Sequence, residues 1–148
     1  MARASIYRPS MLDVEYIAFA LARELMEYDE PIPPFQTRFP GRLESCVRAP
    51  FQTYARKSLY KGVVGKGAAL FYLMVKNHPF QNGNKRIAVT ALFYYLMKNR
   101  RDIRMSNEDV YEFARKVAMS NPANKDTVLR DIEAFIERHC ALTSPRGT

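Results

Sequence analysis

The sequence predicts an all-α fold in a single helical domain. Two apolar runs, residues 67–77 and 87–97, lie close together in the middle of the chain, and each is long enough to form a buried helix. The 148 residues suit one domain with one hydrophobic core. Hydrophobic residues make up 47% of the chain, a share that a disordered segment would not reach.

The N-terminal part predicts one helix followed by a long irregular segment. Ser10 is a suitable N-cap with Asp13 three residues later, so we expect a helix that runs to about residue 26. Residues 28–41 contain four prolines and cannot form a helix. Their aromatic side chains, Phe35 and Phe39, are expected to be exposed on a rigid surface loop.

The segments around the central runs complete the predicted helices. We expect short helices at residues 41–48 and 51–60, and a glycine-rich hinge at residues 62–67. Beyond the second apolar run, residues 99–105 predict a basic turn. Ser106 then caps a helix to about Ser120. A last helix is predicted at residues 125–140, so the domain covers residues 1–142, and the polar tail 143–148 is expected to be disordered.

Composition narrows the class of protein. No apolar run reaches the roughly 18 residues that a membrane-spanning helix needs, and residues 1–10 lack the apolar core of a signal peptide. Cys46 and Cys140 are far apart, which is typical of reduced thiols in a cytoplasmic protein. With two histidines in the chain, a zinc site is not expected.

The nine residues between the apolar runs, His78 to Arg86, form a polar and cationic motif loop, His-Pro-Phe-Gln-Asn-Gly-Asn-Lys-Arg. Pro79 disfavours helical geometry at His78, so the first helix should end near residue 77. Asn84 is a good N-cap for the second helix. The free N–H groups of Gly83 to Arg86 would then bind phosphate at the helix start, and Lys85 and Arg86 would add two cations.

The motif loop also offers a base and an anchor. A histidine side chain titrates near neutral pH, so His78 can take a proton from an attacking hydroxyl group. Phe80 alternates with polar residues and is the expected anchor into the core. A base at one end and a phosphate cradle at the other suit phosphoryl or nucleotidyl transfer, in which positioning and charge stabilisation supply most of the catalysis.

The charge distribution predicts an anionic partner. The net charge is +8, and no Asp or Glu occurs between Ser45 and Arg101. A nucleotide alone does not require so many cations. A solvated basic surface, an acidic protein partner and an RNA or ribosome-associated target all remain open, with nucleic acid not favoured.

The motif loop resembles the core motif of the Fic/Doc superfamily. The match consists of His78-Pro79-Phe80, a two-residue gap, and Gly83-Asn84-Lys85-Arg86. Lys85 stands where nucleotidylating members usually carry a second glycine. This residue, followed by Ile87-Ala88, is similar to the Doc branch, the death-on-curing toxins.

The resemblance implies a function for each residue of the loop. ATP, with Mg²⁺, would bind at Asn82, Gly83, Asn84, Lys85 and Arg86, with Asn82 at the metal position. His78, Lys85 and Arg86 would be catalytic. A phosphoryl group would pass to a Ser or Thr hydroxyl of a translation protein such as elongation factor Tu.

The resemblance also implies partners. Family members hold an extended target segment by strand addition to a flap, which here would be residues 35–39. Many are restrained by a helix with the pattern Ser/Thr-x-x-x-Glu-Gly/Asn, and no such pattern occurs in this chain. Restraint is therefore expected from a separate acidic antitoxin.

Two alternatives remain for the activity. The first is a Fic-type adenylyltransferase, although the further arginine of those enzymes falls here on Val89. The second is a weakly active nucleotide-binding protein, because Asn82 occupies the position where the family commonly has a carboxylate for magnesium. An amide oxygen is a weaker ligand than a carboxylate for a hard cation.

Overall fold

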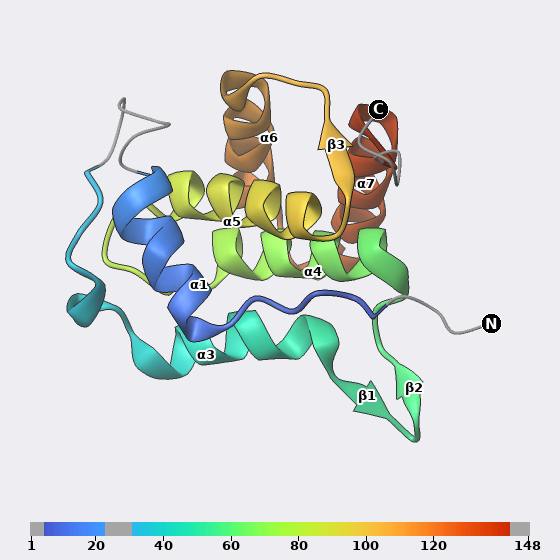
Figure 1. Cartoon of the computed structure of the whole chain (residues 1–148), viewed down its shortest axis with the longest axis horizontal. Helices are drawn as coiled ribbons and strands as arrows, with labels where there is room; N and C mark the ends of the chain where they lie inside the picture. The colour runs from blue at the N-terminus through green and yellow to red at the C-terminus, as the bar shows by residue number, and fades with distance from the viewer. Residues whose placement is uncertain (1–4, 23–30, 143–148) are drawn as a thin grey trace.

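Two antiparallel helices form the centre of the fold and carry the motif loop between them (Figure 1). The computed structural model describes residues 5–22 and 31–142. Helix α4 (Gly62–Lys76) and helix α5 (Asn84–Lys98) pack along each other. The motif loop therefore joins two elements that are themselves fixed in the core.

The remaining helices cover this pair on two sides. Helices α6 (Asn107–Met119) and α7 (Lys125–His139) pack on one side, and α3 (Pro40–Arg48) packs against α4 on the other (Figure 1). In the described residues, only two short strand pairs accompany the helices. The predicted all-α fold is confirmed. None of the helices described is both long enough and apolar enough to cross a membrane.

Close packing of α4 on α5 explains the glycine at position 67, near the start of α4. A Cβ atom at Gly67 would lie 3.0 Å from the ring of Tyr95, and the Tyr95 hydroxyl donates a hydrogen bond to the Val63 carbonyl at 2.8 Å. The prediction of a hinge at residues 62–67 is therefore wrong. These residues are the first turns of α4, and the glycine at 67 allows the helices to approach instead of allowing them to bend.

A β-hairpin replaces the helix predicted at residues 51–60. After a 3₁₀ turn, η3 (Ala49–Phe51), strands β1 (Thr53–Tyr54) and β2 (Lys57–Ser58) pair antiparallel. Ala55 and Arg56 form the turn, with φ of 52° and 66°. Residues 52–59 are all exposed, so a helix here would have no apolar partner to stabilise it. The prediction was wrong for that reason.

A second strand pair closes the other end of the chain. Strand β3 (Arg101–Ile103) pairs antiparallel with β4 (Cys140–Leu142), which follows α7 directly. The basic turn predicted at residues 99–105 is confirmed at residues 99–100, whereas residues 101–103 form strand β3 instead. A 3₁₀ turn, η4 (Pro122–Asn124), separates α6 from α7. The disordered tail predicted at residues 143–148 lies outside the described residues.

The first helix begins as predicted, with Ser10 and Asp13 forming a capping box for α1 (Met11–Tyr16). The helix then widens into a π-helical turn, η1 (Ile17–Leu21). Its predicted continuation to residue 26 lies outside the described residues. This N-terminal part crosses α3 and packs through η1 on α5 (Figure 1).

Asp13 connects α1 to α5 and to the chain before it. One carboxylate oxygen accepts a hydrogen bond from the Tyr7 hydroxyl at 2.5 Å, and the other accepts one from the Tyr94 hydroxyl at 2.9 Å. Burial acts to raise the pKa of Asp13, but the hydrogen bonds from Tyr7, Ser10 and Tyr94 outweigh it and lower the pKa. The hydrogen bond to Asp13, with burial, raises the pKa of Tyr7.

We expect Asp13→Asn to destabilise the fold by about 1–3 kcal/mol at pH 7, because hydrogen bonds to a charged acceptor are lost. Because the pKa of Asp13 is lowered in the folded state, its contribution to the free energy of unfolding is fully present above the ordinary carboxyl pKa of about 4. It is lost as the pH falls through the folded-state value. Urea unfolding of both proteins from pH 7 to pH 3 measures this. A stability difference that did not shrink at low pH would contradict the assignment.

Candidate functional site

The motif loop begins where α4 ends. Asn77 is the C-cap of α4, and His78 follows in the left-handed conformation with φ of 47°. A left-handed residue directly after the cap ends a helix, and glycine is the usual choice because it is not strained there. Pro79 follows and cannot continue a helix. The histidine is therefore held in an unusual conformation at an exposed position.

Residues at the start of α3 hold the first part of the motif loop. The Pro79 carbonyl accepts a hydrogen bond from the Phe39 N–H at 2.8 Å. The His78 carbonyl accepts one from Arg42 Nη1 at 3.4 Å, and the Arg42 guanidinium lies 4.5 Å from the centre of the Phe39 ring. Nothing in the sequence marked Phe39 or Arg42 as supports of the loop, since both lie about 40 positions before it.

The segment before α3 differs from the predicted flap. Phe35 to Thr37 form a 3₁₀ turn, η2 (Phe35–Thr37), not an extended strand, and Phe35 is buried where exposure was predicted. The reason is Phe80, whose ring centre lies 6.2 Å from that of Phe35. Phe39 remains partly exposed. With Phe35 in the core, the segment has no free strand to offer a target in this conformation.

Phe80 and Asn84 give the motif loop its shape. Phe80 is 1% exposed and lies in the hydrophobic core. The buried side-chain amide of Asn84 accepts a hydrogen bond from the Phe80 N–H and donates one to the Phe80 carbonyl, both at 2.9 Å. One side chain therefore satisfies both backbone groups of a buried residue and closes the loop into a tight ring.

Helix α5 starts one residue earlier than predicted. The N-cap is Gly83, with φ of 72°, and Asn84 is the first helical residue. Asn84 does not cap the helix because its side chain is engaged with Phe80. A Cβ atom at Gly83 would lie 2.9 Å from Ile32 Cδ1 and 3.1 Å from the Pro31 carbonyl oxygen. Position 83 thus requires glycine for conformation and for space.

The two cations of the motif loop lie in different surroundings. Arg86 is 5% exposed, and its Nη2 donates a hydrogen bond to the Ala22 carbonyl at 3.0 Å, just after η1. The Arg86 carbonyl accepts a hydrogen bond from the Thr90 hydroxyl one turn later in α5. Lys85 is half-buried. In this conformation, Lys85 is therefore the more accessible of the two charges.

The outward side of the loop is polar. His78, Gln81 and Asn82 are exposed, whereas Phe80, Asn84 and Arg86 point into the protein. Over residues 5–22 and 31–142, no group of three His, Cys, Asp or Glu side chains could hold a metal ion. The loop itself has no carboxylate, so it does not supply the ligand that Mg²⁺ usually takes from a protein, and Asn82 offers a weaker amide oxygen.

Comparison with known proteins identifies the family. The family model described as Fic/DOC family matches residues 12–96, which is more than half of the chain. This chain belongs to the Fic/DOC family. The match covers α3, α4, the motif loop and nearly all of α1 and α5. Neither the comparison with curated proteins nor that with solved structures returned a match.

Fic/DOC proteins are generally transferases that act on other proteins, and the loop between α4 and α5 is where the Fic/DOC motif residues of this chain come together. The structure brings all the candidate residues from His78 to Arg86 into one compact loop. It separates them into an outward polar side and an inward side that holds the loop in place.

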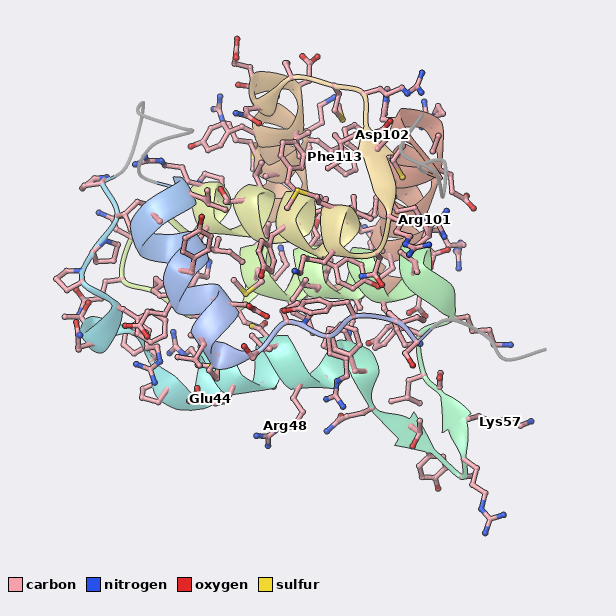
Figure 2. The ribbon with its side chains drawn as sticks, in the orientation of Figure 1. Glu44, Arg48, Lys57, Arg101, Asp102 and Phe113 are labelled. Atoms are coloured by element: carbon pink, nitrogen blue, oxygen red, sulfur yellow. The ribbon has the colours of Figure 1, made fainter. Side chains whose placement is uncertain are left out.

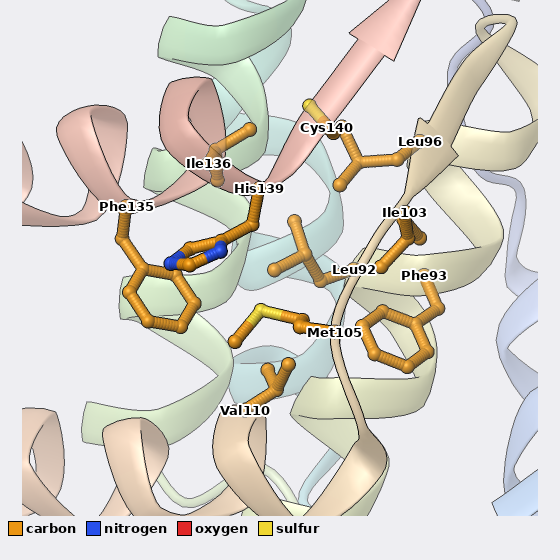
Figure 3. Close-up of a pocket in the computed structure, with 10 residues that line it drawn as sticks. All are labelled: Leu92, Phe93, Leu96, Ile103, Met105, Val110, Phe135, Ile136, His139 and Cys140. Carbon is orange, nitrogen blue, oxygen red and sulfur yellow. The ribbon is translucent and has the colours of Figure 1, made fainter.

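His139 and Cys46 are side chains of reactive type that lie outside the Fic/DOC motif. His139 lines a cavity of about 10 Å³ between α5, α6, α7 and β3, and its ring lies 4.8 Å from that of Phe135 (Figure 3). This space holds at most about one water molecule. Burial raises the pKa of Cys46 to about 11, so its thiol stays protonated and donates to the Leu73 carbonyl. Both side chains serve packing.

We expect Gly83→Ala to destabilise this Fic/DOC domain by about 2–4 kcal/mol, from the strained φ and the contact with Pro31. Gly41→Ala is the matched control, because a Cβ atom there meets nothing within 4 Å. The control should leave stability unchanged or raise it by up to about 1 kcal/mol. Thermal unfolding of both variants checks this, and equal melting temperatures for them would show that position 83 tolerates a side chain.

Proposed function

We propose that this chain is a Doc-like protein kinase that transfers a phosphoryl group from ATP to a Ser or Thr hydroxyl of a protein target. The observation that carries the proposal is the arrangement of the motif loop. His78 is exposed at the end of α4, and Lys85 stands at the start of α5. The bonds from Asn84 to Phe80 fix the chain between these two groups.

In the proposed reaction, the imidazole of His78 accepts the proton of the target hydroxyl as its oxygen attacks the γ-phosphorus of ATP. A bond forms between that oxygen and phosphorus, and the bond to the β-phosphate oxygen breaks. ADP leaves with the electron pair. The left-handed backbone conformation of His78 sets this residue at the outward edge of the loop, where a protein target can reach it.

The phosphates of ATP would lie at the start of α5. The first N–H groups of a helix have no partner within the helix, and the helix dipole favours an anion there. Asn84 and Lys85, the first two residues of α5, would offer their backbone N–H groups. Lys85 would supply the accessible charge. Arg86 would reach the phosphates only by exchanging its hydrogen bond to Ala22, so nucleotide binding would loosen η1.

Two positions favour phosphoryl over adenylyl transfer. Lys85 replaces the second glycine of the nucleotidylating pattern, which crowds the approach of the α-phosphate. The further arginine of that pattern falls on Val89, which is 1% exposed inside α5 and offers no cation. A Fic-type adenylyltransferase remains the second candidate, and a weakly active nucleotide-binding protein is the third because of Asn82.

The proposed partners follow from the family and from charge. The target would be a translation factor such as elongation factor Tu. Because residues 45–101 contain no carboxylate, an acidic antitoxin supplied in trans would be attracted to the same chain. We propose a cytoplasmic location, where a translation factor, the antitoxin and ATP would all be within reach.

We expect His78→Ala to lower transfer by at least about 100-fold while the fold survives, because a positioned base contributes about that much or more. Gln81→Ala is the control in the same loop, since Gln81 is also exposed. Intact-mass analysis of elongation factor Tu after incubation with ATP measures transfer. A gain of one phosphoryl group supports the kinase, whereas a gain of one AMP identifies the adenylyltransferase. Equal labelling by both variants would remove His78 as the base.

The third candidate, a weakly active nucleotide-binding protein, has its own test. Asn82→Asp is expected to raise transfer moderately at low magnesium concentration, because a carboxylate binds this cation better than an amide does. Gln81→Glu adds the same charge at the neighbouring exposed position and should have little effect. Transfer detectable only in the Asn82→Asp protein would show that the natural chain binds nucleotide without useful turnover.

A further inference from the structure

The β1–β2 hairpin projects from the helical body at the end remote from the motif loop (Figure 1). We name residues 53–61, the hairpin and the link to α4, the basic finger. It contains an aromatic ring that nothing covers, since Tyr54 is 75% exposed. Two-residue strands contribute little stability, so the strands and turn of the finger are poorly explained as a support for the core.

The finger carries three exposed cations. Arg56 lies in the turn, Lys57 begins β2, and Lys61 precedes α4. Arg48, at the end of α3, is also exposed, and Figure 2 shows the side chains of Arg48 and Lys57 extending away from the ribbon. No ion pair within the described parts of the chain involves these four side chains. Their charge is therefore available to an anion.

The turn of the finger displays Arg56 at a conformational cost. Ala55 and Arg56 both have positive φ, in positions that glycine or asparagine usually occupy in a two-residue hairpin turn. A left-handed backbone is strained for a residue other than glycine, because its Cβ atom crowds the following carbonyl oxygen. A hollow of about 390 Å³ lies between the hairpin and the start of α4, lined by Lys57, Ser58, Lys61 and Gly62. Its lining offers two amines and a hydroxyl to a phosphate, with no carboxylate to oppose one.

We propose that the basic finger binds single-stranded nucleic acid. Tyr54 would stack on a base, and Arg56, Lys57 and Lys61 would contact successive phosphates. Aromatic stacking combined with a basic surface is how proteins bind single strands without reading their sequence. An acidic peptide would use the cations but would not need the exposed ring of Tyr54, which lies opposite Lys57 in the hairpin, so the ring favours nucleic acid.

The finger is independent of the proposed transfer reaction. It joins the N-terminal end of α4, whereas the motif loop joins the C-terminal end, and 15 helical residues span roughly 22 Å. A bound strand would thus leave His78 free. His78→Ala should bind nucleic acid as the unmodified chain does, so the two proposals can fail separately.

The first experiment tests the aromatic ring. Fluorescence anisotropy with a labelled oligouridylate of roughly 12 nucleotides, a length within known single-strand sites, gives the affinity. Tyr54→Ala is expected to weaken binding roughly 5- to 150-fold, and Tyr54→Phe should retain it because the ring is kept. Equal binding by Tyr54→Ala and the unmodified chain would overturn the proposal.

The second experiment tests the charges. Lys57→Gln with Lys61→Gln should weaken binding and reduce the slope of log affinity against log salt by about 1.4, for two lost contacts to a single strand. Lys116→Gln with Arg130→Gln removes the same charge from exposed positions on α6 and α7 and should leave the slope nearly unchanged. An equal loss in both double variants would show that only net charge matters and would overturn the proposal.

A third experiment asks whether the finger binds an acidic peptide instead of nucleic acid. A poly-glutamate peptide is measured beside the oligonucleotide with the same variants. If the peptide binds through Lys57 and Lys61 while the oligonucleotide does not bind, the finger is a docking surface for an acidic protein and the nucleic-acid assignment is wrong. Because all the substituted positions are exposed, unchanged melting temperatures are expected to accompany each variant.

Discussion

The pair of hydrogen bonds between the Asn84 side chain and the Phe80 backbone is the constraint on which the motif loop depends. It lets a phenylalanine enter the core without leaving its own N–H and carbonyl groups unsatisfied. Without it, burial of Phe80 would conflict with hydrogen bonding of the loop. With it, the polar residues on either side are forced outward, and the loop keeps one shape between two rigid helices.

This constraint extends into the N-terminal part of the molecule. Phe80 packs on Phe35, Gly83 lies beneath Pro31 and Ile32, and Arg86 is bonded to Ala22. Three residues of the loop are thus covered by segments that come 45 to 64 positions earlier in the chain. The N-terminal segment is a structural part of the site, although it contributes none of the motif residues.

The long helices could be predicted from the sequence because their apolar runs are longer than any turn, and because Ser10 and Ser106 are strong caps at the expected places. The β1–β2 hairpin could not be predicted from the sequence. Its strands have two residues each, its turn uses Ala55 and Arg56 instead of glycine, and local propensity there resembles that of a helix. At this segment the absence of an apolar partner decided the structure, and a sequence pattern does not show that absence directly.

The candidate site, too, could be predicted from the sequence only in part. The loop, its position between two helices and its glycine were all visible in the sequence. The burial of Arg86 and the engagement of Asn84 were not, because each depends on a partner that the fold brings close: Ala22 for the arginine and the backbone of Phe80 for the amide. A charged residue beside a predicted helix start looks accessible until the covering segment is known.

The contact between Gly67 and Tyr95 has a consequence for how this sequence can vary. The ring occupies the space that a side chain at position 67 would need, and its hydroxyl is bonded to Val63 in the same helix. A side chain added at position 67 would collide with the ring, and loss of the ring at position 95 would leave a gap at the centre of the helix pair. Substitutions at 67 and 95 are therefore coupled, and divergent sequences that keep this helix spacing should differ at both positions or at neither.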